Sequence, residues 1–92
     1  MQTKICKVIA QTETVYVQSR KNENGQLAKC YIRLRELGGE HEDEYQCAVY
    51  GSLAERRFAP GSTVAAGLRF STHECNGIWY QDIVAHEILS VN

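Results

Sequence analysis

The chain has 92 residues, of which 43% are hydrophobic and 23% charged, and its formal net charge is −1 at pH 7. This length supports one domain with one modest core, so residues 1–92 are treated as a single domain. No stretch approaches about eighteen consecutive apolar residues, and the start MQTKICKVIA has no apolar signal region, so the sequence predicts neither a membrane-spanning helix nor a signal peptide.

Four cysteines lie at positions 6, 30, 47 and 75 and form no CxxC pair. In a chain without an export signal, such spacing is typical of reduced thiols in the cytosol. Cys6, Cys30 and Cys47 are expected to serve as small apolar fillers of the core.

The charges are distributed unevenly although their sum is small. Residues 1–35 carry seven Lys and Arg against two Glu, whereas residues 36–92 carry three Arg against nine acids. Five of those acids fall between Glu36 and Glu44. The basic first third is a candidate surface for a polyanion, and scattered solvated charge is the alternative interpretation.

Residues 3–17 are rich in β-branched side chains and are long enough for one bent strand. A polar loop follows at 19–26 and contains the turn dipeptide Asn24-Gly25. Residues 27–37 then alternate, which predicts a strand with Cys30, Ile32 and Leu34 on one face. Its other face carries Lys29, Tyr31, Arg33 and Arg35.

After an acidic loop, residues 44–51 predict a third strand. Ser52 and Glu55 fit a capping box and predict a helix of about two turns, which Pro60-Gly61 would end.

Residues 62–75 alternate again, with Val64, Ala66, Leu68 and Phe70 predicted inward and Arg69, Ser71 and His73 outward. Asn76-Gly77 is a strong hairpin signal and leads into a last strand over 78–91. Both faces of that last strand are apolar: Ile78, Tyr80, Val84 and Ile88 on one, Trp79, Ile83, Ala85 and Leu89 on the other. One face is therefore expected to lie in the core and part of the other against a second subunit.

Five strands with one short helix between the third and the fourth are the order of an OB-fold, an all-β five-stranded Greek-key barrel. A plain five-stranded meander with an accessory helix is the structural alternative.

Four stretches resemble bacterial single-stranded DNA-binding proteins in order and spacing. AKCYIRL (28–34) resembles their second strand, EYQCAVYGSLAE (44–55) their third strand and helix start, GSTVAAGLRFST (61–72) their fourth strand, and GIWYQDIVAHEI (77–88) their fifth. The pattern NGxWYxD is also similar to a family of short uncharacterised bacterial proteins with an OB-like pattern. The resemblance implies that Tyr50, the aromatic residue before Gly51, stacks on bases. The family's acidic-tipped tail is missing after ILSVN, so recruitment through such a tail is not expected.

The histidines and acids of residues 72–88 raise the possibility of a metal or catalytic site. His73 and Cys75 share a strand face, but a second cysteine pair is missing and His86 lies far along the return strand, so no metal site is predicted. Glu74 and Asp82 could meet across the hairpin as paired carboxylates. No nucleophile elbow, HExxH motif or phosphate loop is present, and the chain is expected to be no enzyme and to need no cofactor.

Binding to single strands requires a positive groove and aromatic faces on which bases stack. The outward face of residues 27–37 supplies both kinds of side chain. The candidate nucleic-acid-binding residues are Arg20, Lys21, Lys29, Tyr31, Arg33, Arg35, Tyr50, Arg69 and Trp79. For Tyr31, Tyr50 and Trp79, packing in the core or in an interface is the alternative role.

The sequence therefore predicts an OB-fold that binds single-stranded DNA, or less readily RNA, with little sequence preference. The motifs do not separate a strand protector in replication or repair from an accessory protein of a mobile element or primosome. A homodimer or homotetramer is expected, with neither a membrane nor a small-molecule substrate as partner. The alternative is an OB-like protein-interaction or assembly module that never contacts nucleic acid.

Overall fold

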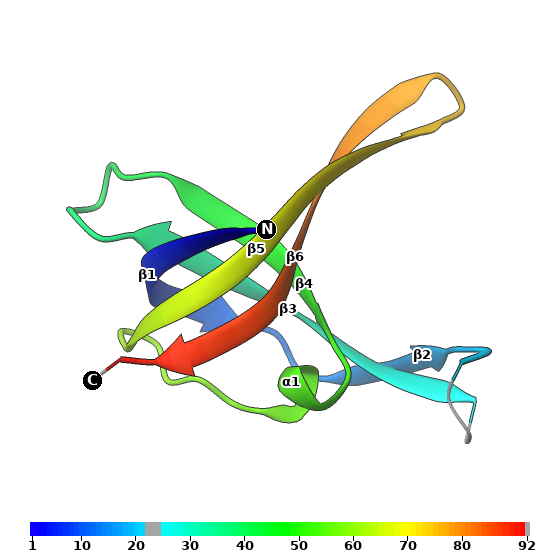
Figure 1. Cartoon of the computed structure of the whole chain (residues 1–92), viewed down its shortest axis with the longest axis horizontal. Coiled ribbons are helices and arrows are strands. Elements are labelled where there is room, and N and C mark those ends of the chain that lie inside the picture. The colour runs from blue at the N-terminus through cyan, green and yellow to red at the C-terminus, as the bar shows by residue number, and fades with distance from the viewer. Residues whose placement is uncertain (22–24, 92) are drawn as a thin grey trace.

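The computed structural model describes residues 1–21 and 25–91, which form six strands and one short helix (Figure 1). The elements are β1 (Gln2–Gln11), β2 (Val15–Gln18), β3 (Gln26–Glu36), β4 (Glu44–Tyr50), α1 (Ser52–Glu55), β5 (Thr63–Cys75) and β6 (Ile78–Ser90). The predicted all-β class, with a short helix before the last two strands, is confirmed. Asn24 of the predicted Asn24-Gly25 turn lies outside the described residues.

The strand pairings close into a ring. β1 pairs with β3 and with β5, β3 pairs with β4, and β5 pairs with β6, all antiparallel. The ring is completed by a parallel contact between β4 and β6 in which Ala48 lies opposite Val84. β2 extends this ring as a partner of the first half of β3.

The first strand is not continuous, contrary to the prediction of one bent strand over 3–17. The ladder breaks after Gln11, and β2 begins at Val15. At the break, the backbone N–H of Thr12 donates to the carbonyl of Tyr31, and the Tyr31 N–H donates to the Thr12 hydroxyl at 2.8 Å. The Thr12 side chain thus replaces one backbone hydrogen bond of the ladder. The backbone can therefore turn at this point, and pairing with β3 resumes where Val15 lies opposite Lys29.

The core follows the predicted alternation in β3 and in the first half of β5. Cys30, Ile32 and Leu34 are buried, as are Val64 and Leu68. The predicted fillers Cys6, Cys30 and Cys47 are all buried free thiols. Burial raises the pKa of the Cys47 thiol to about 12, so it packs as a neutral apolar group.

Phe70 is not in the core, contrary to the prediction, because the β5–β6 hairpin leaves the ring at this point. Every residue from 69 to 81 is exposed, and this arm projects clear of the ring in Figure 1. Phe70 is 36% exposed and packs edge-on against Tyr45 at the rim, with ring centroids 5.8 Å apart.

A bulge in β6 corrects the predicted faces of the last strand. Gly67 pairs with Glu87 and Leu68 with Ala85, which leaves His86 as an extra residue. Ala85 and Ile88 are therefore both buried although they are three residues apart. The uninterrupted alternation had placed Ile88 and Val84 on one face. In the structure Ile88 is buried in the core, whereas Val84 lines the outer groove.

The predicted capping box is absent. Gly51 occupies the N-cap with φ of 73°, a backbone conformation that favours glycine, and no side chain caps the helix. Glu55 instead accepts a hydrogen bond from the Tyr16 hydroxyl at 3.0 Å. Helix α1 has only four residues, and no helix in the described part of the chain is long and apolar enough to cross a membrane.

The segment after α1 is fastened to β1 by the side chain of Gln11. Its amide donates to the Arg56 carbonyl at 2.8 Å, and its amide oxygen accepts from the Phe58 N–H at 2.9 Å. Phe58 is buried at the end of the core. Gln11 thus satisfies the backbone on both sides of Arg57 and helps to seat Phe58.

We expect Gln11→Ala to lower the free energy of unfolding by about 1–3 kcal/mol, because it leaves the Phe58 N–H without its acceptor. Urea denaturation measures this change. Gln2→Ala, the same substitution at an exposed position of β1, is the control and should change stability by no more than about 0.5 kcal/mol. Equal effects of the two variants would contradict the fastening role of Gln11.

Candidate nucleic-acid interface

The outward side chains of four neighbouring strands form one continuous surface. Tyr31 lies opposite Ala48, and Val84 lies opposite Arg69. The parallel contact of Ala48 with Val84 joins these pairs, so that the row crosses β3, β4, β6 and β5. Directly paired residues of a sheet point to the same face, and this face lies outside the ring.

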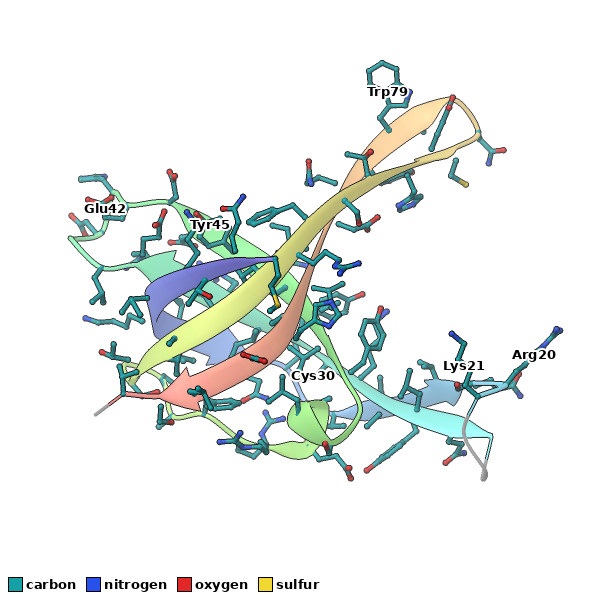
Figure 2. The ribbon with its side chains drawn as sticks, in the orientation of Figure 1. Arg20, Lys21, Cys30, Glu42, Tyr45 and Trp79 are labelled. Atoms are coloured by element: carbon teal, nitrogen blue, oxygen red, sulfur yellow. The ribbon has the colours of Figure 1, made fainter. Side chains whose placement is uncertain are left out.

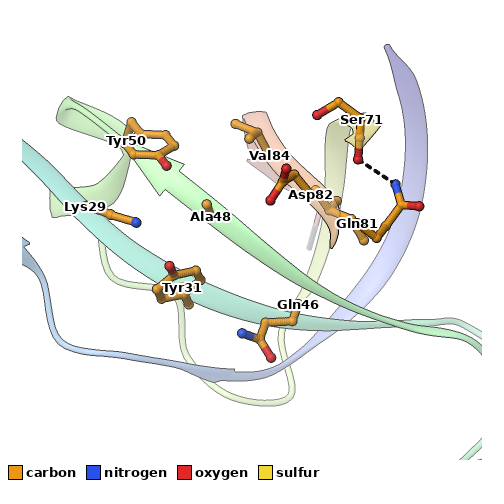
Figure 3. Close-up of a pocket in the computed structure, with 10 residues that line it drawn as sticks. Lys29, Tyr31, Gln46, Ala48, Tyr50, Ser71, Gln81, Asp82 and Val84 are labelled. Carbon is orange, nitrogen blue, oxygen red and sulfur yellow. Dashed lines mark hydrogen bonds between the residues drawn. The ribbon is translucent and has the colours of Figure 1, made fainter. Parts of the chain in front are cut away.

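A groove of about 530 Å³ runs over this surface (Figure 3). On one side it is lined by residues of β3 and β4: Lys29, Tyr31, Gln46, Ala48 and Tyr50. On the other side it is lined by residues of β5 and β6: Ser71, Gln81, Asp82, Ile83 and Val84. The small side chains of Ala48 and Val84 leave room between the tyrosines and the base of the arm.

Lys29 lies between two tyrosine rings within the groove. Its Nζ is 5.0 Å from the centroid of the Tyr31 ring and 5.5 Å from that of Tyr50. Side-chain hydrogen bonding to Tyr31 raises the pKa of Lys29, and the charge interaction with Tyr50 adds to this, so the ammonium stays protonated at neutral pH. Both rings remain accessible, with Tyr31 39% and Tyr50 40% exposed. One fixed cation and two aromatic faces can attract an anion and stack a planar ring.

The wall on the arm side is polar and holds one acid. The Gln81 amide donates to the Ser71 carbonyl at 2.9 Å. The Asp82 carboxylate contacts Nδ1 of His73, and the His73 ring stacks on Tyr80 with centroids 5.0 Å apart. Hydrogen bonding to His73 gives the acid a partner within the arm.

Two of the predicted cations are held by an acid. Arg35 donates to Glu44 at 2.7 and 2.9 Å, and Arg33 donates to the other oxygen of the same carboxylate at 3.0 Å. These hydrogen bonds, that of Arg35 first, lower the pKa of Glu44. One carboxylate therefore offsets part of the positive charge that the sequence assigned to this face.

The rest of the acidic loop lies away from the groove. Glu44 pairs with Arg35 at one end of the β3–β4 ladder and Lys29 with Tyr50 at the other, six residues or about 20 Å away. Figure 2 shows Glu42 on the opposite side of the molecule from Arg20 and Lys21. Glu42 and Glu44 therefore both lie away from the Lys29 end of the groove, although Glu44 holds Arg33 and Arg35.

The nine predicted residues are only partly brought together. Lys29, Tyr31 and Tyr50 line the groove, and Arg69 lies beside it, opposite Val84. Arg20 and Lys21 lie in the exposed turn after β2, outside the groove lining. Arg33 and Arg35 of β3 also lie outside this lining.

Trp79 lies on the other face of the arm. It pairs with Glu74, whereas its neighbour Tyr80 pairs with His73, and successive residues of a strand point to opposite faces. Trp79 is 83% exposed and lines a separate hollow with Thr72, His73 and Glu74. The same alternation separates Glu74 from Asp82, so these two acids do not form a carboxylate pair.

Seven lining residues of the groove were not predicted from the sequence: Gln46, Ala48, Ser71, Gln81, Asp82, Ile83 and Val84. The alternation of EYQCAVY was a usable signal, because it places Gln46, Ala48 and Tyr50 on one face. Asp82 and Val84 had no such signal, since only the parallel contact of β6 with β4 brings them to the groove.

Across residues 1–21 and 25–91, no three His, Cys, Asp or Glu side chains converge as metal ligands would. No known protein family matches the sequence, and no curated protein is significantly similar to it. The resemblance to single-stranded DNA-binding proteins therefore stays a prediction from its motifs.

We expect Glu44→Gln to strengthen binding to polyanions, because it releases the guanidinium groups of Arg33 and Arg35 from a carboxylate. Retention on a heparin column should shift to higher salt. Glu42→Gln removes the same charge from a loop side chain that forms no ion pair within the described residues, and it should shift retention less. Equal shifts would mean that net charge alone matters and that pairing with Glu44 does not.

Proposed function

We propose that this protein binds single-stranded DNA, or less readily RNA, with little sequence preference and without catalysis or a cofactor. The observation that supports this most directly is the Lys29 ammonium between the exposed rings of Tyr31 and Tyr50 in an open groove. A positive charge beside aromatic faces suits phosphates and unpaired bases at once. Stacking tolerates every base because every base has a π-face, hence the expected lack of sequence preference.

We further propose that the ring is an OB-fold barrel. If β1 and β2 together are counted as the first strand of the barrel, then β3, β4, β5 and β6 are its second to fifth strands. The neighbours around the ring are then first, second, third, fifth and fourth, and the fourth pairs again with the first. The short helix between the third and fourth strands supports the same assignment. The four free cysteines fit a reducing compartment, and we propose the cytosol.

The first test is binding of a fluorescent thymidine oligonucleotide at increasing salt. If three to five phosphates are engaged, the logarithm of the binding constant should fall with the logarithm of salt at a slope of about −2 to −3.5. Absence of binding at low salt would contradict the nucleic-acid proposal and favour an assembly module.

Variants separate charge from stacking in the groove. Lys29→Gln should weaken binding and flatten the salt slope by about 0.7, whereas Tyr50→Leu should cost about 1–3 kcal/mol with an unchanged slope. Lys7→Gln makes the same change at an exposed position of β1 and is the control. It should leave the binding constant near that of the unmodified chain. A Tyr50→Leu protein that is folded and binds normally would show that its ring does not stack on bases.

A second observation favours self-assembly, which we propose as an additional property. Ile5 pairs with Ala65 and Ala65 with Leu89, so that an apolar row crosses the outside of β1, β5 and β6. Ile5 is 46% and Leu89 59% exposed. No residue of this row lines the groove. We propose that a second copy covers the row in a two-fold symmetric homodimer or homotetramer.

Light scattering in reducing buffer should give at least twice the 10.4 kDa mass of one chain. Leu89→Glu should shift the population to monomer, because it places a charge in the apolar row. Ile78→Glu makes the same kind of change at the exposed arm tip and should leave the mass unchanged. Dissociation by Ile78→Glu alone would place the interface on the arm, and a monomeric unmodified chain would overturn the assembly proposal.

A further inference from the structure

A second hollow lies next to the groove on the same outer face. It measures about 250 Å³ and is lined by Ala10, Gln11 and Thr12 at the end of β1, together with Ile32 and Arg33 of β3. It shares Tyr31 and Gln46 with the groove. The strand register explains the position, because Ala10 lies opposite Arg33 and Arg33 opposite Gln46.

We propose that this second hollow is a subsite for one nucleobase, which packs against Tyr31 on the side away from Lys29. The proposal rests on the proposed function and adds to it a position for a specific part of the ligand. A strand that enters at the arm would cross the groove, pass Tyr31 and Gln46, and place its next base beside Ala10. Figure 3 shows Tyr31 and Gln46 at the edge of the groove that this path would cross.

The two sides of Tyr31 differ in what is already present. The Lys29 ammonium lies over the ring, and Lys29 lines the groove but not the second hollow. A base entering on the groove side meets a cation above the ring, which suits a phosphate at least as well as a base. The second hollow offers access to Tyr31 without Lys29, and its cation, Arg33, is paired with Glu44.

The walls of the second hollow suit a base better than a phosphate. The surface of the hollow is mainly apolar and includes Ala10, Thr12 and Tyr31, whereas the Ile32 side chain points into the core. Arg33 and Gln46 supply polar atoms at its border. Only one guanidinium nitrogen of Arg33 contacts Glu44, so other N–H groups can donate to a base carbonyl. An apolar wall with donors at its border matches the flat face and polar edge of a nucleobase.

The path has the length that several nucleotides require. From β1 through β3, β4 and β6 to β5, the surface crosses four strand gaps of about 4.8 Å, or about 19 Å in all. A single OB-fold covers about 4–16 nucleotides, so adjacent base positions on both sides of Tyr31 fit within one site.

Three alanine-to-leucine variants test the proposal with one chemical change. Ala10→Leu fills the second hollow, Ala48→Leu fills the groove, and Ala59→Leu adds the same side chain at an exposed loop position that belongs to neither lining. Binding of a thymidine oligonucleotide of about 12 residues should weaken about 5- to 150-fold for Ala10→Leu, the effect of losing one stacked base. Ala59→Leu should bind as the unmodified chain does, and circular dichroism with thermal melting verifies that each variant is folded.

Abasic substitution links the loss to one base. In the unmodified protein, one abasic position should weaken binding by about the same factor as Ala10→Leu, and in Ala10→Leu that same position should have no further effect. If the unmodified chain binds no oligonucleotide, the proposed function itself fails. If the unmodified chain binds, Ala48→Leu weakens binding and Ala10→Leu matches Ala59→Leu, the function stands and the second subsite is overturned. A lower melting temperature for Ala10→Leu, without any change in the abasic pattern, would likewise overturn it.

Discussion

The parallel contact of β4 with β6 is the constraint on which the other features of this molecule depend. Parallel strands cannot be joined by a tight turn, so the chain must pass through α1 and β5 before β6 can reach β4. That contact closes the ring and buries the core. It also brings the base of the arm beside Tyr31 and Tyr50, so the groove exists only because the ring closes there.

Small side chains make this closure compatible with a groove. Ala48 and Val84 face each other at the contact and point outward. Larger residues at these positions would fill the space between the tyrosines and the arm. The identity of two small residues therefore matters as much for the proposed site as the aromatic rings beside them.

The positive charge of the outer face depends more on which cations are paired with acids than on how many cations the sequence holds. Seven cations in the first 35 residues suggest a strongly basic surface. The structure shows a narrower arrangement, in which Glu44 holds Arg33 and Arg35 and Lys29 is the cation within the groove. If the protein binds a polyanion, phosphate must compete with Glu44 for those two arginines.

The sequence by itself determined the features that depend on neighbouring residues. Alternation fixed the buried face of β3 with Cys30 and Ile32, and Asn76-Gly77 fixed the β5–β6 hairpin, because a strand points successive side chains to opposite faces and a tight turn needs positive φ. Tertiary structure decided what depends on distant partners: the break after Gln11, the exposure of Phe70, the bulge at His86 and the approach of Asp82 to Tyr31. None of these has a local signal, since each follows from where the ring ends and which strands close it.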